Sequence, residues 1–400
     1  MSSQNEAFTN PTATRPFDPR KYVSPKYTEF MDADATGVQP MIVCVHEDRP
    51  EYLIGLKLTV LSLARHCPDL PVIISCPHPP DTFRQWVATL SNAQLMADPN
   101  LAGLSWNVKP TILLKCLNEG HRDVIWIDTD ILVNQDFRPR LGCLDDRTLV
   151  VTQEVYWGQQ QGGNHRTLAW GLKPERILPT TVNTGVVRVT PQHIELLHAW
   201  QTLLNHPAYR QAQLQPYYER PLHMLTDQEV LTALLGSTEF SDIPIEMLER
   251  GVDIAQCFGP AGYTPTERLH NLRRGLPAFI HSMGRKPWER APSPRQVWNS
   301  EEPLLRRLRK YYDYIHLELS PYTALAREYQ EQVGEEATWM EIKSIPARIL
   351  ATLSAGHPTL QGFPLALFDA GVRYTRQLIG IGRYRFDSSF NLESSPLSQT

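Results

Sequence analysis

The sequence predicts an α/β protein with a mostly parallel, Rossmann-like sheet flanked by helices, and three observations support this prediction. An apolar strand at 41–45, a stretch with helical apolar spacing at 53–64 and a second apolar strand at 72–74 form a βαβ unit. Strands and helices then continue to alternate along the chain. Polar residues follow several strands, as expected where ligands bind at the carboxyl ends of a parallel sheet.

The later elements follow in the same order. We expect helices at 111–118, at 192–204 and from about 227, and strands at 124–127, 184–189 and 278–280. Residues 1–40 are polar and lack a period, which predicts a disordered or extended tail. The pattern past residue 301 is helical. We therefore divide the chain into a tail at 1–40, a globular unit at 41–300 and a helical extension at 301–400.

Composition excludes several classes of protein. The chain has 400 residues, 42% of them hydrophobic, which is enough for a large core, and its net charge of −4 argues against a nucleic-acid binder. Its six cysteines form no CxxC pair, so we expect reduced core thiols. No secretory signal or membrane-spanning run is visible. The expected compartment is the cytoplasm, with or without contact to the inner membrane surface.

Two carboxylates one residue apart, Asp128-Thr129-Asp130, stand directly after the predicted strand at 124–127. In this position both can reach one divalent ion while the ion bridges the phosphates of a nucleotide. Aspartates after a strand also serve as plain turn residues, so the spacing alone leaves both interpretations open. Asp32-Ala33-Asp34 has the same spacing but lies in the polar tail, where we expect no metal.

Two further groups bring amide and carboxylate side chains to the ends of predicted elements. Asn183-Thr184-Gly185 opens a strand and sets an amide beside a glycine, which lets a ligand approach the backbone. Asp227-Gln228 begins a helix, where negative charge is favoured. A simple helix cap is the alternative for the second group.

A third group begins at His281, directly after the predicted strand at 278–280. The segment His281-Ser-Met-Gly-Arg-Lys-Pro-Trp288 contains an imidazole, which can complete a metal's coordination beside two carboxylates. It also contains Lys286, which can neutralise phosphate charge.

A strand followed by DxD also suits a phosphatase of the haloacid dehalogenase type. In that family the motif normally follows the first core strand, whereas here a complete βαβ unit comes earlier. A nucleotidyltransferase would need a Gly-rich basic loop after the first strand, and residues 45–50 are Val-His-Glu-Asp-Arg-Pro. A nucleotide-sugar-binding protein without catalysis is the remaining alternative.

Taken in order from Met41 to Trp288, these motifs resemble glycosyltransferase family 8, enzymes of the GT-A nucleotide-diphospho-sugar transferase fold that include glycogenin and bacterial lipopolysaccharide galactosyl- and glucosyltransferases. The resemblance implies a divalent metal, Mn²⁺ or Mg²⁺, on Asp128, Asp130 and His281. It implies a UDP-sugar donor contacted by Tyr52, Lys109, Thr129, Gly185, Gly284 and Lys286. Asn183 and Asp227 would contact the transferred sugar, with Gln228 near its anomeric carbon.

The resemblance further implies transfer of a hexose with retention of configuration. No carboxylate in the sequence must be a covalent nucleophile, so attack by the acceptor on the face that the phosphate leaves is the simpler hypothesis. The acceptor stays open among glycan, lipid, protein and small alcohol, because acceptor pockets are built from loops such as 155–166. The stretch 363–385 mixes apolar residues with arginines, which suits either an anionic membrane surface or packing of an ordinary amphipathic helix.

Overall fold

The computed structural model describes residues 41–154, 164–259, 262–289, 294–333 and 339–378. The predicted tail at 1–40 with Asp32 and Asp34, most of the loop 155–166, and the chain beyond 378 lie outside these ranges. Within them, no helix combines the length and apolar character needed to cross a membrane.

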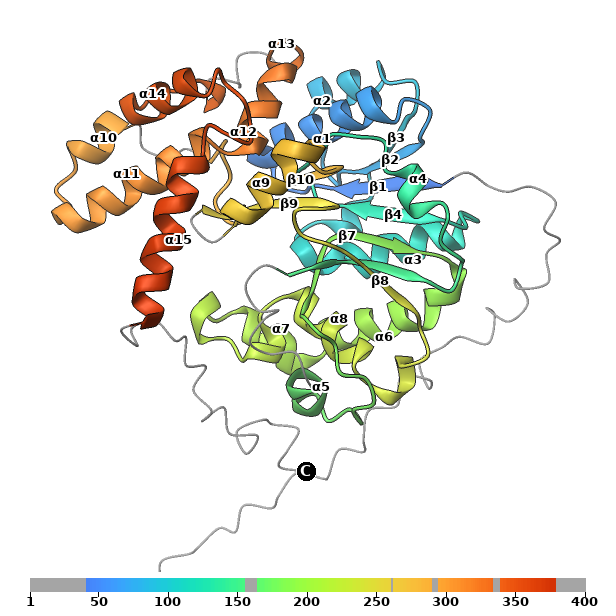
Figure 1. Ribbon diagram of the computed structural model, residues 1–400. Helices are drawn as coiled ribbons and strands as arrows, with labels where there is room; N and C mark the ends of the chain where they lie inside the picture. Colours follow the sequence, from blue (N-terminus) through green and yellow to red (C-terminus); the bar gives the residue numbers. More distant parts are fainter. Residues whose placement is uncertain (1–40, 155–163, 260–261, 290–293, 334–338, 379–400) are drawn as a thin grey trace, which may run out of the picture.

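Seven strands form the central sheet, in the order β3, β2, β1, β4, β7, β6, β8 (Figure 1). Every strand runs in the same direction except β7, which is antiparallel to both of its neighbours. The predicted α/β class with a mostly parallel sheet is confirmed. The strands are β1 (Ile42–His46), β2 (Val72–Ser75), β3 (Ala93–Met96), β4 (Val124–Ile127), β6 (Leu149–Gln153), β7 (Val182–Val189) and β8 (Ile245–Leu248).

Helices cover both faces of this sheet, and the alternation of side chains along each strand supplies two cores (Figure 1). Val124 and Trp126 of β4 face one core, whereas Ile125 and Ile127 face the other. Helices α3 (Lys109–Asn118), α6 (Ile194–Leu204) and α8 (Asp227–Leu235) cover the first face, and α1 (Leu53–His66) and α2 (Asp81–Val87) cover the second. The other helices before residue 290 are α4 (Arg138–Leu141), α5 (His165–Ala169), α7 (Pro207–Gln213) and α9 (Pro265–Arg274).

A second sheet of three strands lies beside the first. Its strands are β5 (Ile131–Val133), β10 (Phe279–Ser282) and β9 (Ile254–Cys257), with β10 in the middle. The strand predicted at 278–280 is present but runs two residues further, because His281 pairs with Gln256 of β9 and lies within β10. This pairing fixes the backbone of His281.

The βαβ unit and the other predicted elements are present, with shifted ends. The helix predicted at 111–118 begins at Lys109, because Pro110 suits the first turn, where no amide is needed. The helix predicted at 192–204 begins with a 3₁₀ turn before α6. All six cysteines are free, and Cys143 is exposed, contrary to the expectation that all are core residues.

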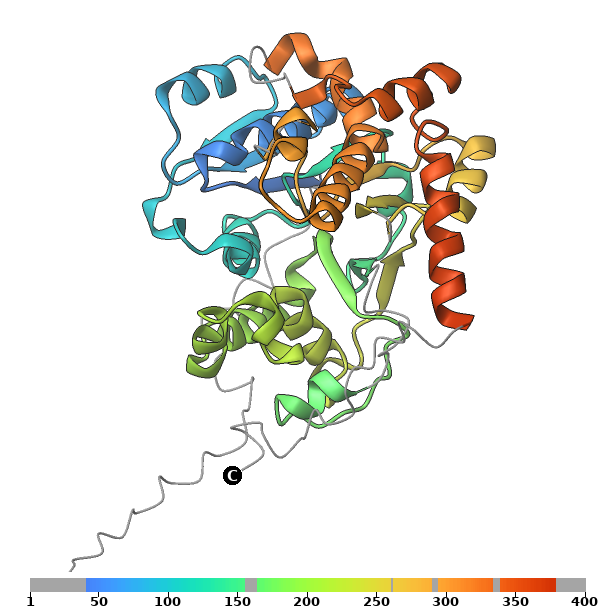
Figure 2. The ribbon, with the colours of Figure 1, turned by 90° about the vertical axis from the view of Figure 1, so that its left-hand side faces the viewer.

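The residues after 294 form helices that pack on the second sheet and on one another. They are α10 (Pro294–Trp298), α11 (Leu304–Glu318), α12 (Pro321–Ala326), α13 (Gln330–Val333), α14 (Ile345–Leu353) and α15 (Phe363–Leu378). Tyr322 and Ala326 of α12 share a core with Leu132 and Ile280. Figure 2 shows α11, α14 and α15 together on one side of the molecule.

Candidate active site

The end of the sheet at which β4 ends collects most of the predicted site residues. Because β7 runs antiparallel to β4, its first residues lie beside the last residues of β4. The N-terminus of α8 and strand β10 reach the same place. A cleft of about 380 Å³ opens there, and eleven of the twelve predicted site residues line it: Tyr52, Lys109, Asp128, Thr129, Asp130, Asn183, Asp227, Gln228, His281, Gly284 and Lys286.

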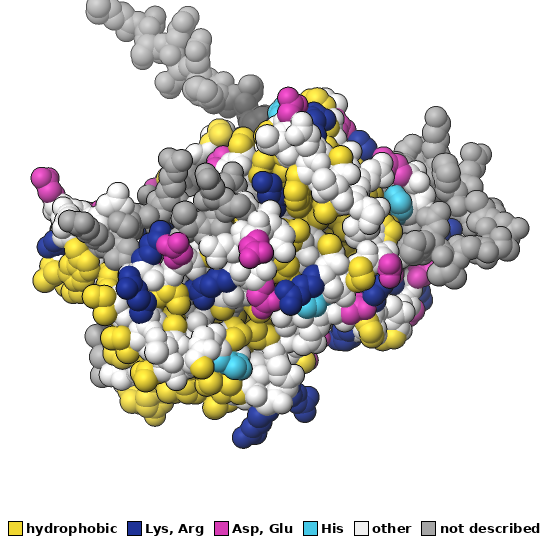
Figure 3. Space-filling model, turned by 90° about the horizontal axis from the view of Figure 1, so that it is seen from above, with side chains coloured by type: hydrophobic (Ala, Val, Ile, Leu, Met, Phe, Trp, Pro, Cys, Tyr) yellow, Lys and Arg dark blue, Asp and Glu magenta, His cyan; other side chains and the backbone are white. Residues whose placement is uncertain are grey.

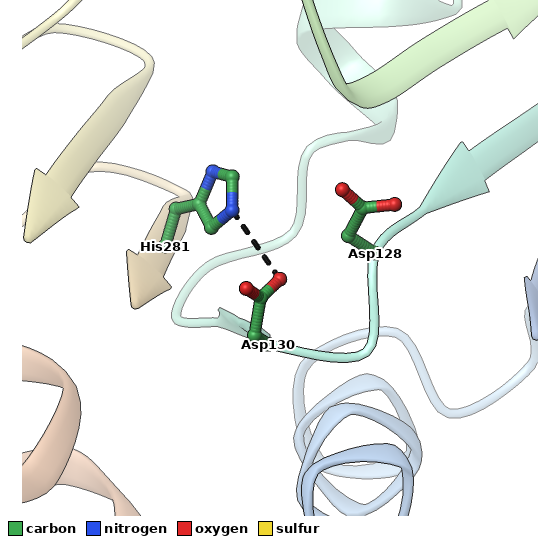
Figure 4. Close-up of side chains that lie close together, drawn as sticks. All are labelled: Asp128, Asp130 and His281. Carbon is green, nitrogen blue, oxygen red and sulfur yellow. Dashed lines mark ion pairs between the residues drawn. The ribbon is translucent and has the colours of Figure 1, made fainter. Parts of the chain in front are cut away.

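Asp128, Asp130 and His281 form the one group of three or more His, Cys, Asp or Glu side chains among the described residues that could hold a metal ion. Their ligand atoms lie within 4.8 Å of one another. The two aspartates come from the turn between β4 and β5 and the histidine from β10, and the three side chains face one another (Figure 4). Two carboxylates with one imidazole suit Mn²⁺ and also Mg²⁺, so the residues present fit such an ion.

Asp130 is buried beside His281 and Lys286. Its Oδ1 lies 3.2 Å from His281 Nε2, and its other oxygen accepts a hydrogen bond from Lys286 Nζ. Burial by itself would raise the pKa of Asp130, but Lys286 and His281 outweigh it and hold the pKa well below its usual range. Asp130 is therefore a carboxylate throughout the neutral range.

Asp128 is oriented from two sides. Trp126 donates its indole N–H to Oδ1 at 2.7 Å, and Lys109 Nζ lies 3.1 Å from the same oxygen. Because Trp126 is the second-last residue of β4, a side chain of the strand positions the first aspartate of the motif. Sequence reasoning missed Trp126, whose place two residues before Asp128 was the available signal.

Lys109 links the metal group to the other half of the cleft. It is only 3% exposed, and its Nζ lies 3.5 Å from Asp227 Oδ2 as well as close to Asp128. It also donates to Thr184 Oγ1 at 2.8 Å. Burial alone would lower the pKa of Lys109, but the carboxylates of Asp128 and Asp227 prevail and raise it. A buried cation is thus held between two carboxylates.

Asn183 and Gln228 are joined by a residue that the sequence did not single out, Glu154. Its Oε2 accepts from Asn183 Nδ2 at 2.9 Å and from Gln228 Nε2 at 3.0 Å. The Asn183 carbonyl oxygen accepts from the N–H of Gly185 at 2.9 Å. Both amides are therefore held in one orientation. Glu154 directly follows β6, so its position at the end of a strand could have revealed it.

Behind this network lies a buried acid. Glu229 accepts from both the N–H and the hydroxyl of Thr226, forming a capping box at the start of α8. The helix cap anticipated as an alternative for Asp227 is thus supplied by Thr226, and Asp227 faces the cleft. Burial raises the pKa of Glu229 to about 7, although Arg166, itself 2% exposed, opposes the rise.

An aromatic and charged wall closes the side of the cleft next to α1. The Arg49 guanidinium lies 3.8 Å from the centre of the Tyr52 ring, and the Tyr52 hydroxyl donates to Glu289 at 2.5 Å. Burial together with Glu289 raises the pKa of Tyr52 to about 12. Trp288 stands edge-on to Tyr52. One face of the Tyr52 ring, which the resemblance implies to contact the UDP-sugar, is therefore covered by Arg49.

Two glycines in this region are required by close packing. A Cβ on Gly185 would lie 2.8 Å from the His281 ring, and one on Gly55 would lie 2.6 Å from Trp288. Gly185 was predicted to give a ligand access to the backbone, but His281 occupies that space, and Gly185 does not line the cleft. Its lack of a side chain makes room for the imidazole.

No protein-family model matches the chain, and no curated protein matches its sequence. Solved structures similar to it are glycosyltransferases. The galactosyltransferase LgtC, in complex with donor and acceptor sugar analogues, aligns at 17% identity over 68% of this chain and 95% of its own, with a TM-score of 0.42.

Two others align comparably. The bifunctional glycosyltransferase WbbM aligns at 13% identity over 70% of this chain and 52% of its own, with a TM-score of 0.45. Mouse xyloside xylosyltransferase 1 aligns at 13% identity over 61% of this chain and 97% of its own, with a TM-score of 0.39. At these identities and TM-scores the likeness assigns no role to any residue of this chain.

Proposed function

We propose that this protein is a metal-dependent glycosyltransferase that uses a nucleoside diphosphate sugar, most simply a UDP-hexose, as donor. The supporting observation is that a carboxylate, carboxylate and imidazole group opens into the same cleft as two lysines and a set of fixed amides. A diphosphate needs the cations, and a sugar needs the hydrogen-bonding groups. The cleft offers both within one space.

Asp128, Asp130 and His281 are the residues that would hold the metal. A bound Mn²⁺ or Mg²⁺ supplies Lewis-acid stabilisation of the leaving diphosphate. Lys286, at the opening of the same group, adds positive charge for the phosphates, and the positive φ of +71° at Gly284 turns the chain tightly before it. Arg49 covers one face of the Tyr52 ring. The other face would stack on the nucleotide base of the donor.

The reacting sugar is assigned to the other half of the cleft. Gln228 uses its amide N–H groups on Glu154 and Glu229, at 3.0 and 3.3 Å. Among the described residues its carbonyl oxygen receives only the 3.3 Å contact from Asn183, so it can be presented to the anomeric centre. Asp227 keeps one oxygen on Thr184 and Lys109. Because Asp227 is restrained in this way, we assign it to positioning the sugar rather than to forming a covalent bond with it. This role agrees with front-face attack by the acceptor and retention of configuration.

The phosphatase alternative requires one of the two aspartates to act as a nucleophile. Both oxygens of Asp128 carry contacts, since Trp126 and Lys109 bind Oδ1 and Lys109 also lies 3.3 Å from Oδ2. Asp130 is likewise held by His281 and Lys286. These contacts do not by themselves exclude attack on phosphorus, but a complete βαβ unit precedes β4, unlike the phosphatase order, so the transferase is favoured.

Release of UDP from a panel of UDP-sugars, with water as acceptor, tests the proposal. We expect slow hydrolysis of one donor with Mn²⁺ and none with EDTA. Release of inorganic phosphate from a phosphomonoester, with no UDP-sugar hydrolysis, would support the phosphatase. UDP binding by calorimetry without turnover on any acceptor would support a nucleotide-sugar-binding protein. Absence of UDP binding would refute both the glycosyltransferase and the binding protein.

A further inference from the structure

Among the described residues, exposed large hydrophobic side chains are concentrated on the C-terminal helices. Twelve of the nineteen exposed large hydrophobic side chains among the described residues lie between Trp298 and Leu378. Figure 3 shows hydrophobic and Lys or Arg side chains next to one another on the side of the molecule where α10, α11 and α14 lie. Concentrated exposure of this kind marks a surface that meets an apolar partner.

Helix α14 carries the clearest case, because it is apolar on two faces. Ala347, Leu350 and Ala351 pack against Ile315 and Leu319 around α11. Ile345, Ile349 and Leu353 repeat every four residues on another face and are 69%, 54% and 80% exposed. A helix that is apolar on both faces is expected to be covered on both.

The exposed charges on the two helices themselves are positive, whereas two exposed acids, Glu301 and Glu341, lie just before α11 and α14. The exposed charged side chains of α11 and α14 are Arg306, Arg309 and Arg348. The two acidic residues of α11 are withdrawn: Asp313 is half-buried, and Glu318 is buried and accepts from the N–H groups of Lys343 and Ser344. Helix α11 adds Leu304, Leu305 and Leu308, which are 57%, 80% and 46% exposed.

We propose that this face, formed by Ile345, Ile349 and Leu353 of α14 with Arg348 and the first two turns of α11, docks on an anionic lipid bilayer. Apolar side chains beside arginines, with no exposed acid on the two helices, suit the boundary between acyl chains and anionic headgroups. The site lies earlier in the chain than the segment 363–385 considered from sequence, and it is independent of the chemistry in the cleft.

Sedimentation of the full chain with vesicles tests the proposal. We expect co-sedimentation with phosphatidylcholine vesicles containing phosphatidylglycerol and little with phosphatidylcholine alone, weakening as salt rises. Leu353→Gln should weaken binding about tenfold, and Arg348→Gln about fivefold. Leu214→Gln is the matched control, because Leu214 is 79% exposed and Leu353 is 80% exposed. It should bind as the wild type does.

Three results would overturn the proposal. Failure to bind either vesicle would do so, and so would equal weakening by Leu353→Gln and Leu214→Gln. The third is a dimer in solution, measured by light scattering, that Leu353→Gln dissociates without changing vesicle binding. Circular dichroism melting of each variant ensures that a loss of binding is not a loss of fold, and the hydrolysis of UDP-sugar by Leu353→Gln should equal that of the wild type.

Discussion

Lys109 and Leu353 occupy opposite environments, and each is the reverse of what its side chain prefers. The lysine is 3% exposed and touches two carboxylates, whereas the leucine is 80% exposed. In the cleft, buried charges are stabilised by one another, so that removing one leaves its partners unpaired. On α14, nothing among the described residues covers the exposed face. The buried charge of Lys109 is therefore explained by contacts within the cleft, whereas the exposure of Leu353 is explained by the proposed contact with a bilayer.

The largest expected effect is on turnover. Asp130→Ala removes a predicted metal ligand and should lower metal-dependent UDP release by at least about a thousandfold. Asp146→Ala, at an exposed aspartate in a turn, is the control and should keep wild-type rates. Undiminished activity of the Asp130 variant, with an unchanged melting temperature, would remove the metal assignment.

The next effect tests whether the buried charges hold the cleft together. Lys109→Met leaves Asp128 and Asp227 without their cation and should destabilise the fold by about 3–5 kcal/mol in urea unfolding. Lys115, on the same helix, pairs with Asp98 at the surface at 2.9 Å, so Lys115→Met should cost less than about 1 kcal/mol. Equal losses from the two changes would show that burial of Lys109 is of no consequence.

A pH series tests the buried acid behind the cleft. Because the pKa of Glu229 rises to about 7 in the folded state, the protonated form is favoured by folding. Its contribution to stability is complete below the unfolded pKa of about 4.3 and is lost as the pH rises through 7.

Glu229→Gln removes this dependence, since the amide cannot ionise. The wild type should therefore lose stability relative to the variant, by on the order of 3 kcal/mol, between pH 4.5 and pH 8. Glu175→Gln, at an exposed site, should leave the pH profile of unfolding as it is. Parallel profiles for wild type and Glu229→Gln would contradict the assignment.

A smaller effect is expected from Glu154, which orients two amides without reaching the donor itself. Glu154→Gln should lower kcat for UDP-sugar hydrolysis roughly tenfold while leaving the KM for the donor nearly constant. A role in folding alone would instead lower the melting temperature with kcat unchanged. That result would show that Glu154 has no role in the reaction.

The smallest effect concerns the exposed helix face. Leu353→Ala should change stability by less than about 0.5 kcal/mol, because the side chain is exposed in the folded protein as well. Leu319→Ala, at a leucine that is 1% exposed, should cost about 2–5 kcal/mol. A large loss from the Leu353 change would mean that the face is covered by another part of the same chain.

Much of the cleft could be anticipated from sequence. Asp128, Asp130 and His281 stand at the ends of apolar runs, and the structure brings all three within ligand reach. Glu154, Trp126 and Arg49 were missed because each looks like an ordinary residue of a strand or loop. Glu154 acts on Gln228, which lies 74 positions away. Trp126 and Arg49 act on near neighbours, Asp128 and Tyr52, which lie 2 and 3 positions away.

Several elements could be predicted from sequence, since periodic apolar residues and turn residues act locally, whereas others such as β3, β6 and β8 were not predicted. The sequence by itself determined the βαβ unit, strand β4 and the carboxylates after it. Only the tertiary structure decided that β7 is reversed, because strand direction depends on pairing between distant segments. That reversal brings Asn183 to the carboxyl end of β4. The exposure of Ile345, Ile349 and Leu353 was likewise decided by packing, because only one face of α14 can lie against α11.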